Sequence, residues 1–305
     1  MNIVPQLYDE SNFLQQKDAN ELFTSIAEEF RNRKVKSVID VGCGTGNVTA
    51  DILRFTDCDK LIAFDKSDSM IEFARQRHRN AKISFQIADI CDEWSKLKSD
   101  INLNEEVDVV FSVHCLHWIT DKAKAIENIS KMLKPGGQCY ALLFFWSDIL
   151  PLQEQITHFP KWNKYFSHLE KSDVTTTDKC LSPGKQRRRS SAPFPVYLRS
   201  DEQATINEWK SLCDSSGFSE TQVSVKKSVF CFDDFTGFKD EVTSLCHFLR
   251  YIPDTLKQEF LNDYFDHVKN CYTSDQKIHP KVELRYECLI ICATKSANKE
   301  TVQDQ

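Results

Sequence analysis

The sequence lacks any continuous apolar segment long enough to cross a membrane. Its longest apolar run, residues 139–146, falls well short of the ~20 residues that a membrane-spanning helix requires, and Asp148 follows it closely. Residues 1–13 also lack the basic flank and the apolar stretch of a secretory signal, and they carry Asp9 and Glu10. We therefore expect a cytoplasmic protein without a transmembrane helix.

An excess of positive charge is also absent. The 305 residues have a formal net charge of -6, whereas a general nucleic-acid-binding protein needs a basic surface to contact phosphates. The hydrophobic fraction of 41% and the aromatic fraction of 11% are typical of a folded globular chain. We expect a small-molecule substrate, no nucleic acid and no membrane partner; the oligomeric state is open.

The cysteines do not form a zinc-binding pattern. There are 12 of them, scattered singly, and no two close pairs occur. Cys115 lies between His114 and His117, a spacing too compact for a tetrahedral site. We therefore expect no metal and predict buried free thiols, several of them within apolar runs, such as Cys139, Cys231, Cys288 and Cys292.

Short β-rich runs alternate with segments of helical spacing in the first half of the chain. Strands are expected at 37–41, 60–65, 83–88, 107–113 and 138–145, and helices at 19–30, 48–53, 70–74 and 121–133. Ser67 or Ser69 is expected to cap the third helix, since Ser69 and Glu72 have the spacing of a capping box. The alternation predicts an α/β fold with helices on both faces of a parallel sheet.

The regular pattern lapses after residue 149. Residues 171–200 are polar, contain prolines and include the basic run 185–189, so we expect a mobile surface insertion. The basic run is typical of a solvated loop, and phosphorylation of Ser190 or Ser191 is the alternative. Helices are then expected at 202–215, 238–251 and 254–271, strands at 221–232 and 282–294, and a polar tail at 298–305.

A glycine-rich loop follows the first expected strand. It reads Asp40, Val41, Gly42, Cys43, Gly44, Thr45 and Gly46, and it lies between a strand and a helix, where a backbone without Cβ atoms can approach a ligand closely. A nicotinamide-binding loop would read G-x-G-x-x-G, but here the third glycine comes one residue early. A purely structural turn is the alternative.

Acidic residues end the next two strands. Asp65, followed by Lys66, ends the second strand, the place from which a carboxylate in such folds accepts hydrogen bonds from ribose hydroxyls. Asp89, followed by Ile90, comes directly after the third strand, where a loop cap is the alternative. Three strand ends in this order predict a site for an adenosine-containing cofactor.

These motifs resemble class I S-adenosylmethionine-dependent methyltransferases with a methyltransferase type 11 domain. The Leu-His-Trp at 116–118, the Asp at 121 and the Leu-Lys-Pro-Gly-Gly at 133–137 fit that branch. The opening of the chain, with Leu-Tyr at 7–8, Ser-Asn at 11–12, Leu-Gln at 14–15 and Lys-Asp-Ala at 17–19, resembles arthropod juvenile hormone acid methyltransferases. The likeness extends to 251–253 and 260–264, whereas residues 171–200 depart from it.

The resemblance implies a Rossmann-like class I methyltransferase fold with a seven-stranded, mostly parallel sheet, an antiparallel final edge and helices on both faces. It also implies one methyltransferase domain over 1–297: a cofactor-binding half at 1–150, then the insertion, then a substrate cap and C-terminal strands at 201–297. The apolar C-terminal helices are either the roof of a greasy pocket or plain core, because helical spacing is the same for both. We favour core for most of their aromatic residues, which include Phe248, Tyr251, Phe260, Phe265 and Tyr272.

The resemblance also implies roles for the site residues. The cofactor is S-adenosylmethionine, bound by the expected set Asp40, Gly42, Cys43, Gly44, Gly46, Asp65, Lys66, Asp89 and Ile90. Within it, Asp89 and Ile90 meet the adenine. Gln15 and Trp118 hold the substrate carboxylate, and both side chains can donate hydrogen bonds. His117 either orients the substrate, acts as a base for a less acidic acceptor, or is structural.

The expected reaction is carboxyl O-methylation of a hydrophobic acid such as farnesoic or juvenile hormone acid. One alternative keeps the cofactor and changes the acceptor to a trans-aconitate-like acid, a hydroxyl or an amine. Another alternative is a binding protein that retains the fold without catalysis. The chain length of the acid and its stereochemistry do not follow from the sequence.

Overall fold

The computed structural model of the chain describes residues 4–31, 33–167, 201–274 and 281–297. The expected insertion at 171–200, with Ser190 and Ser191, and the expected tail at 298–305 therefore lie outside the described residues. Among the described residues, no helix is both long and apolar enough to cross a bilayer.

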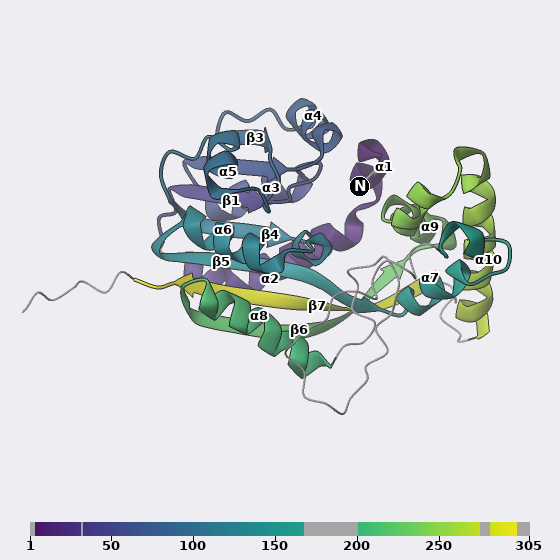
Figure 1. The fold of residues 1–305 in the computed structure, drawn as a ribbon. Coiled ribbons are helices and arrows are strands. Elements are labelled where there is room, and N and C mark those ends of the chain that lie inside the picture. The colour runs from purple at the N-terminus through teal and green to yellow at the C-terminus, as the bar shows by residue number, and fades with distance from the viewer. Residues whose placement is uncertain (1–3, 32, 168–200, 275–280, 298–305) are drawn as a thin grey trace, which may run out of the picture.

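Seven strands form one sheet in the order β3-β2-β1-β4-β5-β7-β6 (Figure 1). Their bounds are β1 Ser37–Val41, β2 Lys60–Asp65, β3 Ile83–Ile87, β4 Val107–Val113, β5 Leu133–Ser147, β6 Phe218–Phe232 and β7 Val282–Lys295. The first five strands pair in parallel, and β7 runs antiparallel to both β5 and β6. The expected seven-stranded, mostly parallel sheet with antiparallel pairing at its final edge is confirmed.

Helices cover both faces of the sheet, as expected from the alternation of strands and helices. The apolar residues of α2 (Phe13–Phe30), α3 (Asn47–Thr56) and α4 (Asp68–Arg77) join one core. Those of α5 (Trp94–Asp100), α6 (Lys122–Met132) and α8 (Glu202–Ser215) join a second core on the other face. Burial of each apolar stripe against the sheet holds these layers together.

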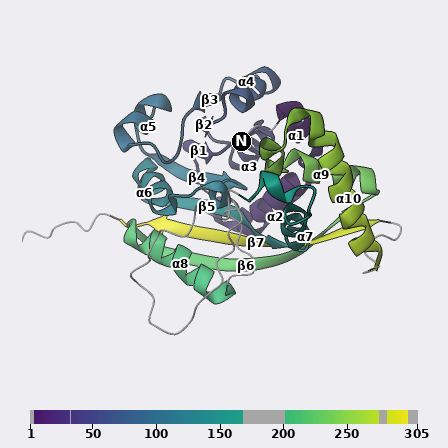
Figure 2. The ribbon, with the colours of Figure 1, turned by 45° about the vertical axis from the view of Figure 1, so that its right-hand side comes forward.

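Further helices gather beyond the carboxyl ends of the parallel strands (Figures 1 and 2). They are α1 (Pro5–Ser11), α7 (Leu150–Thr157), α9 (Phe235–Ser244) and α10 (Lys257–Ser274). Helix α1 packs on α9, and α7 packs on α10. In the part of the chain that the structure describes, the short 3-10 turns are η1 Leu116–Trp118, η2 Asn163–Tyr165, η3 His247–Tyr251 and η4 Asp254–Leu256.

Aromatic rings form the core of this helical cap. Trp162 meets Phe260 edge to face with ring centroids 5.2 Å apart, and Phe166 meets Phe248 in the same way at 5.3 Å. Phe265 and Tyr272 are buried in the same core, which continues onto the α2 face of the sheet. The prediction that most C-terminal aromatic residues are plain core is therefore confirmed.

Several local predictions were wrong. Helix α2 begins at Phe13 rather than at residue 19. Its first turns were missed because they bury the polar Gln15 and Asp18, which do not contribute to a pattern of apolar residues. Helix α7 occupies a stretch where no helix was expected. The N-cap of α4 is Ser67, and no side-chain hydrogen bond caps the helix, so the capping box of Ser69 with Glu72 does not form.

The eleven cysteines that the structure describes are all free thiols. Cys139 and Cys288 are buried and Cys292 is partly buried, but Cys231 is exposed. Cys231 belongs to β6, an edge strand with an exposed face on which alternate side chains meet solvent. The prediction of a buried thiol at Cys231 was therefore wrong.

Candidate active site

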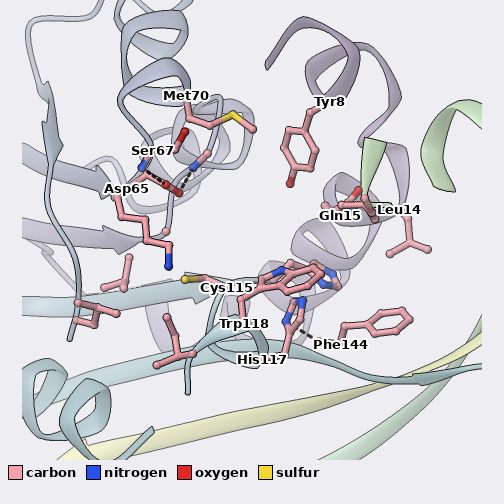
Figure 3. A pocket seen from close by; sticks show the side chains of 18 of the residues that line it. Tyr8, Leu14, Gln15, Asp65, Ser67, Met70, Cys115, His117, Trp118 and Phe144 are labelled. Carbon is pink, nitrogen blue, oxygen red and sulfur yellow. Dashed lines mark hydrogen bonds between the residues drawn. The ribbon is translucent and has the colours of Figure 1, made fainter. Parts of the chain in front are cut away.

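A cavity of about 1500 Å³, which includes the open space at its mouth, lies at the carboxyl ends of the parallel strands. Its glycine-loop side is lined by Gly42, Gly44, Asp65, Lys66, Met70, Asp89 and Ile90. Its helix side is lined by Tyr8, Leu14, Gln15, Phe144, Glu241, Val242 and Leu245. Figure 3 shows Asp65 and Met70 across from Gln15 and Leu14, with Trp118 between them.

The glycine loop brings bare backbone to the cavity wall. Gly42 has φ +76°, and a Cβ at this position would lie 2.2 Å from the Sγ of Cys115. A Cβ at Gly44 would meet only the Tyr8 ring, at 3.6 Å. Gly46 lines neither this cavity nor the smaller hollow beside it; it packs against Phe85, and a Cβ there would lie 3.0 Å from that ring. Gly42 and Gly44 thus shape the site, and Gly46 lets the helix pack close to the sheet.

Asp40 and Cys43 line the smaller hollow next to the main cavity. Asp40 is buried, and its Oδ2 accepts a hydrogen bond from the Thr49 hydroxyl at 2.6 Å. Burial raises the pKa of Asp40 to about 7; the Thr49 bond opposes this rise, and the charge of Asp65 adds to it. A cation bound nearby would lower that pKa again and keep the carboxylate ionised.

Asp65 lies at the end of β2 with its carboxylate fixed by backbone amides. Oδ2 accepts from the Gly44 N–H at 3.2 Å, and Oδ1 accepts from the Ser67 N–H at 2.9 Å. Burial raises the pKa of Asp65, and these two hydrogen bonds oppose the rise. Each oxygen retains a lone pair for a ligand donor. The neighbouring Lys66 also lines the cavity, with an exposed side chain.

Asp89 and Ile90 lie in the loop after β3. The Oδ1 of Asp89 accepts from the Cys91 N–H at 2.9 Å, a local turn of the kind that was the alternative to a ligand role. Asp89 nevertheless lines the cavity, as does the buried Ile90. The buried Asn128 side chain donates to the carbonyl of Ile90 at 2.7 Å and anchors the loop.

These residues fit an adenosine-bearing cation better than a phosphate. Asp65 and Asp89 are acidic, and Ile90 and Met70 offer apolar surface to a flat ring. The glycine loop leaves space where a Cβ would lie against Cys115. A pyrophosphate would instead require donors and positive charge in place of the carboxylates.

Gln15 and Trp118, 103 positions apart in the sequence, both line the cavity. Gln15 is only 4% exposed, and among the described residues its Oε1 has no hydrogen-bond partner. Trp118 belongs to the 3-10 turn that follows β4, and its ring lies 4.9 Å from that of His117. An unpaired buried amide oxygen is costly, and a 180° turn of the amide would present its NH₂ group there instead, which points to a polar ligand at this position.

His117 is a neutral, buried histidine. Its Nδ1 accepts a hydrogen bond from the Phe144 N–H at 3.3 Å (Figure 3), so the ring proton resides on Nε2. Burial, and then the charge of His114, hold the pKa of His117 well below 6.5. This geometry makes Nε2 a donor and leaves no ring nitrogen free to accept a proton, which favours orientation over base catalysis.

A buried hydrogen-bond cluster lies beside the cavity and was not predicted. His114 Nε2 lies 2.9 Å from Asp18 Oδ2, and the Tyr286 hydroxyl donates to Asp18 Oδ1 at 2.7 Å. His114 has a left-handed backbone with φ 54°. Ligand atoms of Asp18, His114 and Cys288 lie within 4.8 Å of one another, but hydrogen bonds already occupy both oxygens of Asp18. Asp18 on a buried helix stripe was the only sequence signal for this cluster.

Comparison with known protein families shows which family the chain belongs to. A family model described as a methyltransferase domain matches residues 32–214, which is more than half of the sequence. The chain belongs to this methyltransferase family. The enzyme is S-adenosylmethionine-dependent, and its glycine loop, Asp65 and Asp89 lie where the cofactor side of such a fold is expected.

The methyltransferase is similar to two insect enzymes over most of its length. It is 29% identical to the juvenile hormone acid O-methyltransferase of Bombyx mori, over 88% of this chain and 87% of the relative. It is 26% identical to that of Drosophila melanogaster, over 85% and 80%. A solved structure from Bacillus halodurans C-125 that is assigned to the methyltransferases shares the fold, with a TM-score of 0.50 and 15% identity over 90% of this chain and 99% of that one.

Proposed function

We propose that the enzyme methylates the carboxylate of a hydrophobic acid, such as farnesoic or juvenile hormone acid, and releases a methyl ester and S-adenosylhomocysteine. The observation that carries this proposal is the apolar surface formed by Leu14, Phe144, Val242 and Leu245, which borders the buried side chain of Gln15. The names of the two insect relatives support an acid as acceptor. An apolar wall with few polar groups is the usual form of a site for a greasy ligand.

On the glycine-loop side, we assign the cofactor to the residues that the sequence singled out. Gly42 and Gly44 would admit it close to the backbone, and Asp65 would accept hydrogen bonds from its ribose. Asp89 and Ile90 would hold its adenine. When bound, S-adenosylmethionine supplies an electrophilic methyl group on a sulfonium. The carboxylates of this side complement that positive charge.

On the helix side, the task is alignment. A carboxylic acid of ordinary pKa is already ionised at neutral pH, so the reaction requires no general base. The neutral His117, with its Nδ1 occupied, agrees with this. Gln15 and Trp118 donate hydrogen bonds to the carboxylate and hold one oxygen in line with the methyl group, while the apolar wall excludes water.

An acceptor screen tests the proposal. Purified enzyme would be incubated with labelled S-adenosylmethionine and a panel of farnesoic acid, juvenile hormone acid, trans-aconitate, a phenol and a primary amine. We expect methyl esters of the hydrophobic acids to dominate. Methylation of the phenol or the amine without esterification of any acid would overturn the carboxyl assignment.

Two substitutions test the acceptor residues. Gln15→Ala and Trp118→Phe each remove a hydrogen-bond donor to a charged group, worth about 1.5–3 kcal/mol, so kcat/KM should fall about 10- to 150-fold. Affinity for S-adenosylhomocysteine should stay within about twofold, because the cofactor side is untouched. Gln6→Ala, exposed on α1, and Trp94→Phe, outside the cavity, are the matched controls. Unchanged ester formation would exclude the two residues from the acceptor site.

A further inference from the structure

Glu241 is a buried acid in the wall of the cavity. It lies on α9 and is 2% exposed. Phe238 and Val242 share its buried helix face, so the acid occupies a position where the pattern of the helix calls for an apolar residue. Among the residues that the structure describes, neither carboxylate oxygen of Glu241 has a hydrogen-bond partner.

The polar groups that oppose the effect of burial on the ionisation of Glu241 are uncharged. They are the Gln15 side chain and the backbone N–H groups of Leu14 and Phe13, each of which lowers its pKa. The charged and titratable groups that face it are Asp18 on α2, which is itself ionised, and Tyr8 on α1. Within the described part of the chain, no salt bridge includes Glu241.

The protonation state follows from these contacts. Burial raises the pKa of Glu241 to about 8; Gln15 and the two backbone amides oppose the rise, and the charge of Asp18 adds to it. The group is therefore mainly a neutral carboxylic acid at neutral pH. In that form it has one O–H donor as well as acceptor oxygens.

We propose that Glu241 is a substrate-positioning residue that donates a hydrogen bond from its protonated carboxyl group to the carboxylate of the substrate, beside the amide of Gln15. The inference rests on the proposed function and extends it: the acceptor site is a set of neutral donors, and its anion selectivity depends on a proton. An ionised Glu241 would repel the substrate carboxylate, because two negative charges close together in a buried site raise each other's electrostatic energy. An amine or hydroxyl acceptor would require the opposite state, in which an ionised Glu241 accepts a hydrogen bond.

Kinetics as a function of pH test this assignment on the full-length enzyme. With farnesoic acid as the probe, KM of the wild type should be constant below about pH 8 and rise about tenfold per pH unit above it, because binding then takes up a proton. Glu241→Gln keeps a neutral donor and should have a flat profile with a KM close to the low-pH value. Glu241→Ala should have a KM about tenfold above the low-pH wild-type value, without the rise above pH 8, and its kcat should change less.

The matched control is Asp240→Asn, which alters an exposed acid one position earlier on the same helix. Its KM should follow the wild-type profile. A KM that falls as pH rises, or a Glu241→Gln profile that still rises in parallel with the wild type, would overturn the proposal.

A second measurement does not depend on turnover or on the variants. The infrared difference spectrum of the wild type across this pH range should show the loss of a buried, protonated carboxyl band that depends on Glu241. That band should be absent from Glu241→Gln if the variant folds, whereas the band of the buried Asp40, whose pKa is also raised, should persist. If no acid in the panel is esterified but the band is present, the proposed function fails while the neutral Glu241 stands. If esters form but no such band is present, the proposed function stands and the role of Glu241 falls.

Discussion

Gly42→Ala probes how closely the glycine loop approaches Cys115. The new Cβ would lie 2.2 Å from the Cys115 Sγ and 2.4 Å from its Cβ, so the whole Cys115 side chain has to move. Overpacking of this kind costs about 1–3 kcal/mol. The left-handed φ of +76° adds about 1–2 kcal/mol for a residue with a Cβ. We expect a loss of about 2–5 kcal/mol in the free energy of unfolding, together with weaker binding of S-adenosylhomocysteine.

Gly136→Ala separates the two contributions to this cost. Gly136 has the same φ of +76°, but a Cβ there would have nothing within 4 Å, so only the backbone cost of about 1–2 kcal/mol applies. Urea unfolding of both variants, with calorimetric titration of S-adenosylhomocysteine, gives the comparison. Cys115→Gly in the Gly42→Ala background should recover most of the difference. Equal destabilisation of the two single variants, with normal ligand binding by both, would refute the close approach.

Three further outcomes follow from the site. Asp65→Ala should weaken S-adenosylhomocysteine binding about 10- to 150-fold, from the loss of about 1.5–3 kcal/mol of charged hydrogen bonding; unchanged calorimetric affinity would remove Asp65 from the ribose site. Burial opposes ionisation of Asp18, but the hydrogen bond and charge of His114 hold its pKa below 3.8. The ionised Asp18 therefore stabilises the folded protein above pH 3.8, and this contribution to the free energy of unfolding is lost as pH falls. Asp18→Asn should therefore lower the urea midpoint at neutral pH, with a difference from wild type that shrinks below about pH 4; a difference independent of pH would contradict this reasoning. Because the pKa of His117 lies well below 6.5, kcat should show no inflection near pH 6.5; an inflection that His117→Gln abolishes would restore a base role.

The cofactor side could be predicted from the sequence because its signals are local. A β-rich run that ends abruptly in glycines specifies a strand and a tight turn within a few residues. Asp65 and Asp89 end the next two strands, and parallel strands bring their carboxyl ends to the same edge of a sheet. Topology alone therefore placed Gly42, Gly44 and Asp65 together. Gly46 was expected beside the cofactor but packs against the ring of Phe85. The sequence could not separate these two roles, because close contact with a ring and close contact with a ligand both require a glycine.

The acceptor side could be predicted only in part. Gln15 and Trp118 came from a family likeness, because nothing in their spacing says that they line one cavity. Asp18 and Glu241 were missed because each is a polar residue on the buried face of a helix. A search for apolar periodicity treats such a residue as a break in the pattern and not as a functional group. Their burial depends on contacts with β7 and α1, which are distant in sequence.

The distribution of charge across the cavity explains how one site can bring a cation and an anion together under the proposed reaction. The glycine-loop side carries the acidic residues Asp65 and Asp89, and the helix side carries Gln15, Trp118 and Glu241, which we propose to be neutral donors. A lysine or arginine in place of Gln15 would bind a carboxylate more strongly, but it would stabilise the ground state as much as the transition state and would not speed the reaction. Neutral donors hold the carboxylate without cancelling its charge. In a buried site of low dielectric, that charge would retain its attraction for the sulfonium of a bound cofactor.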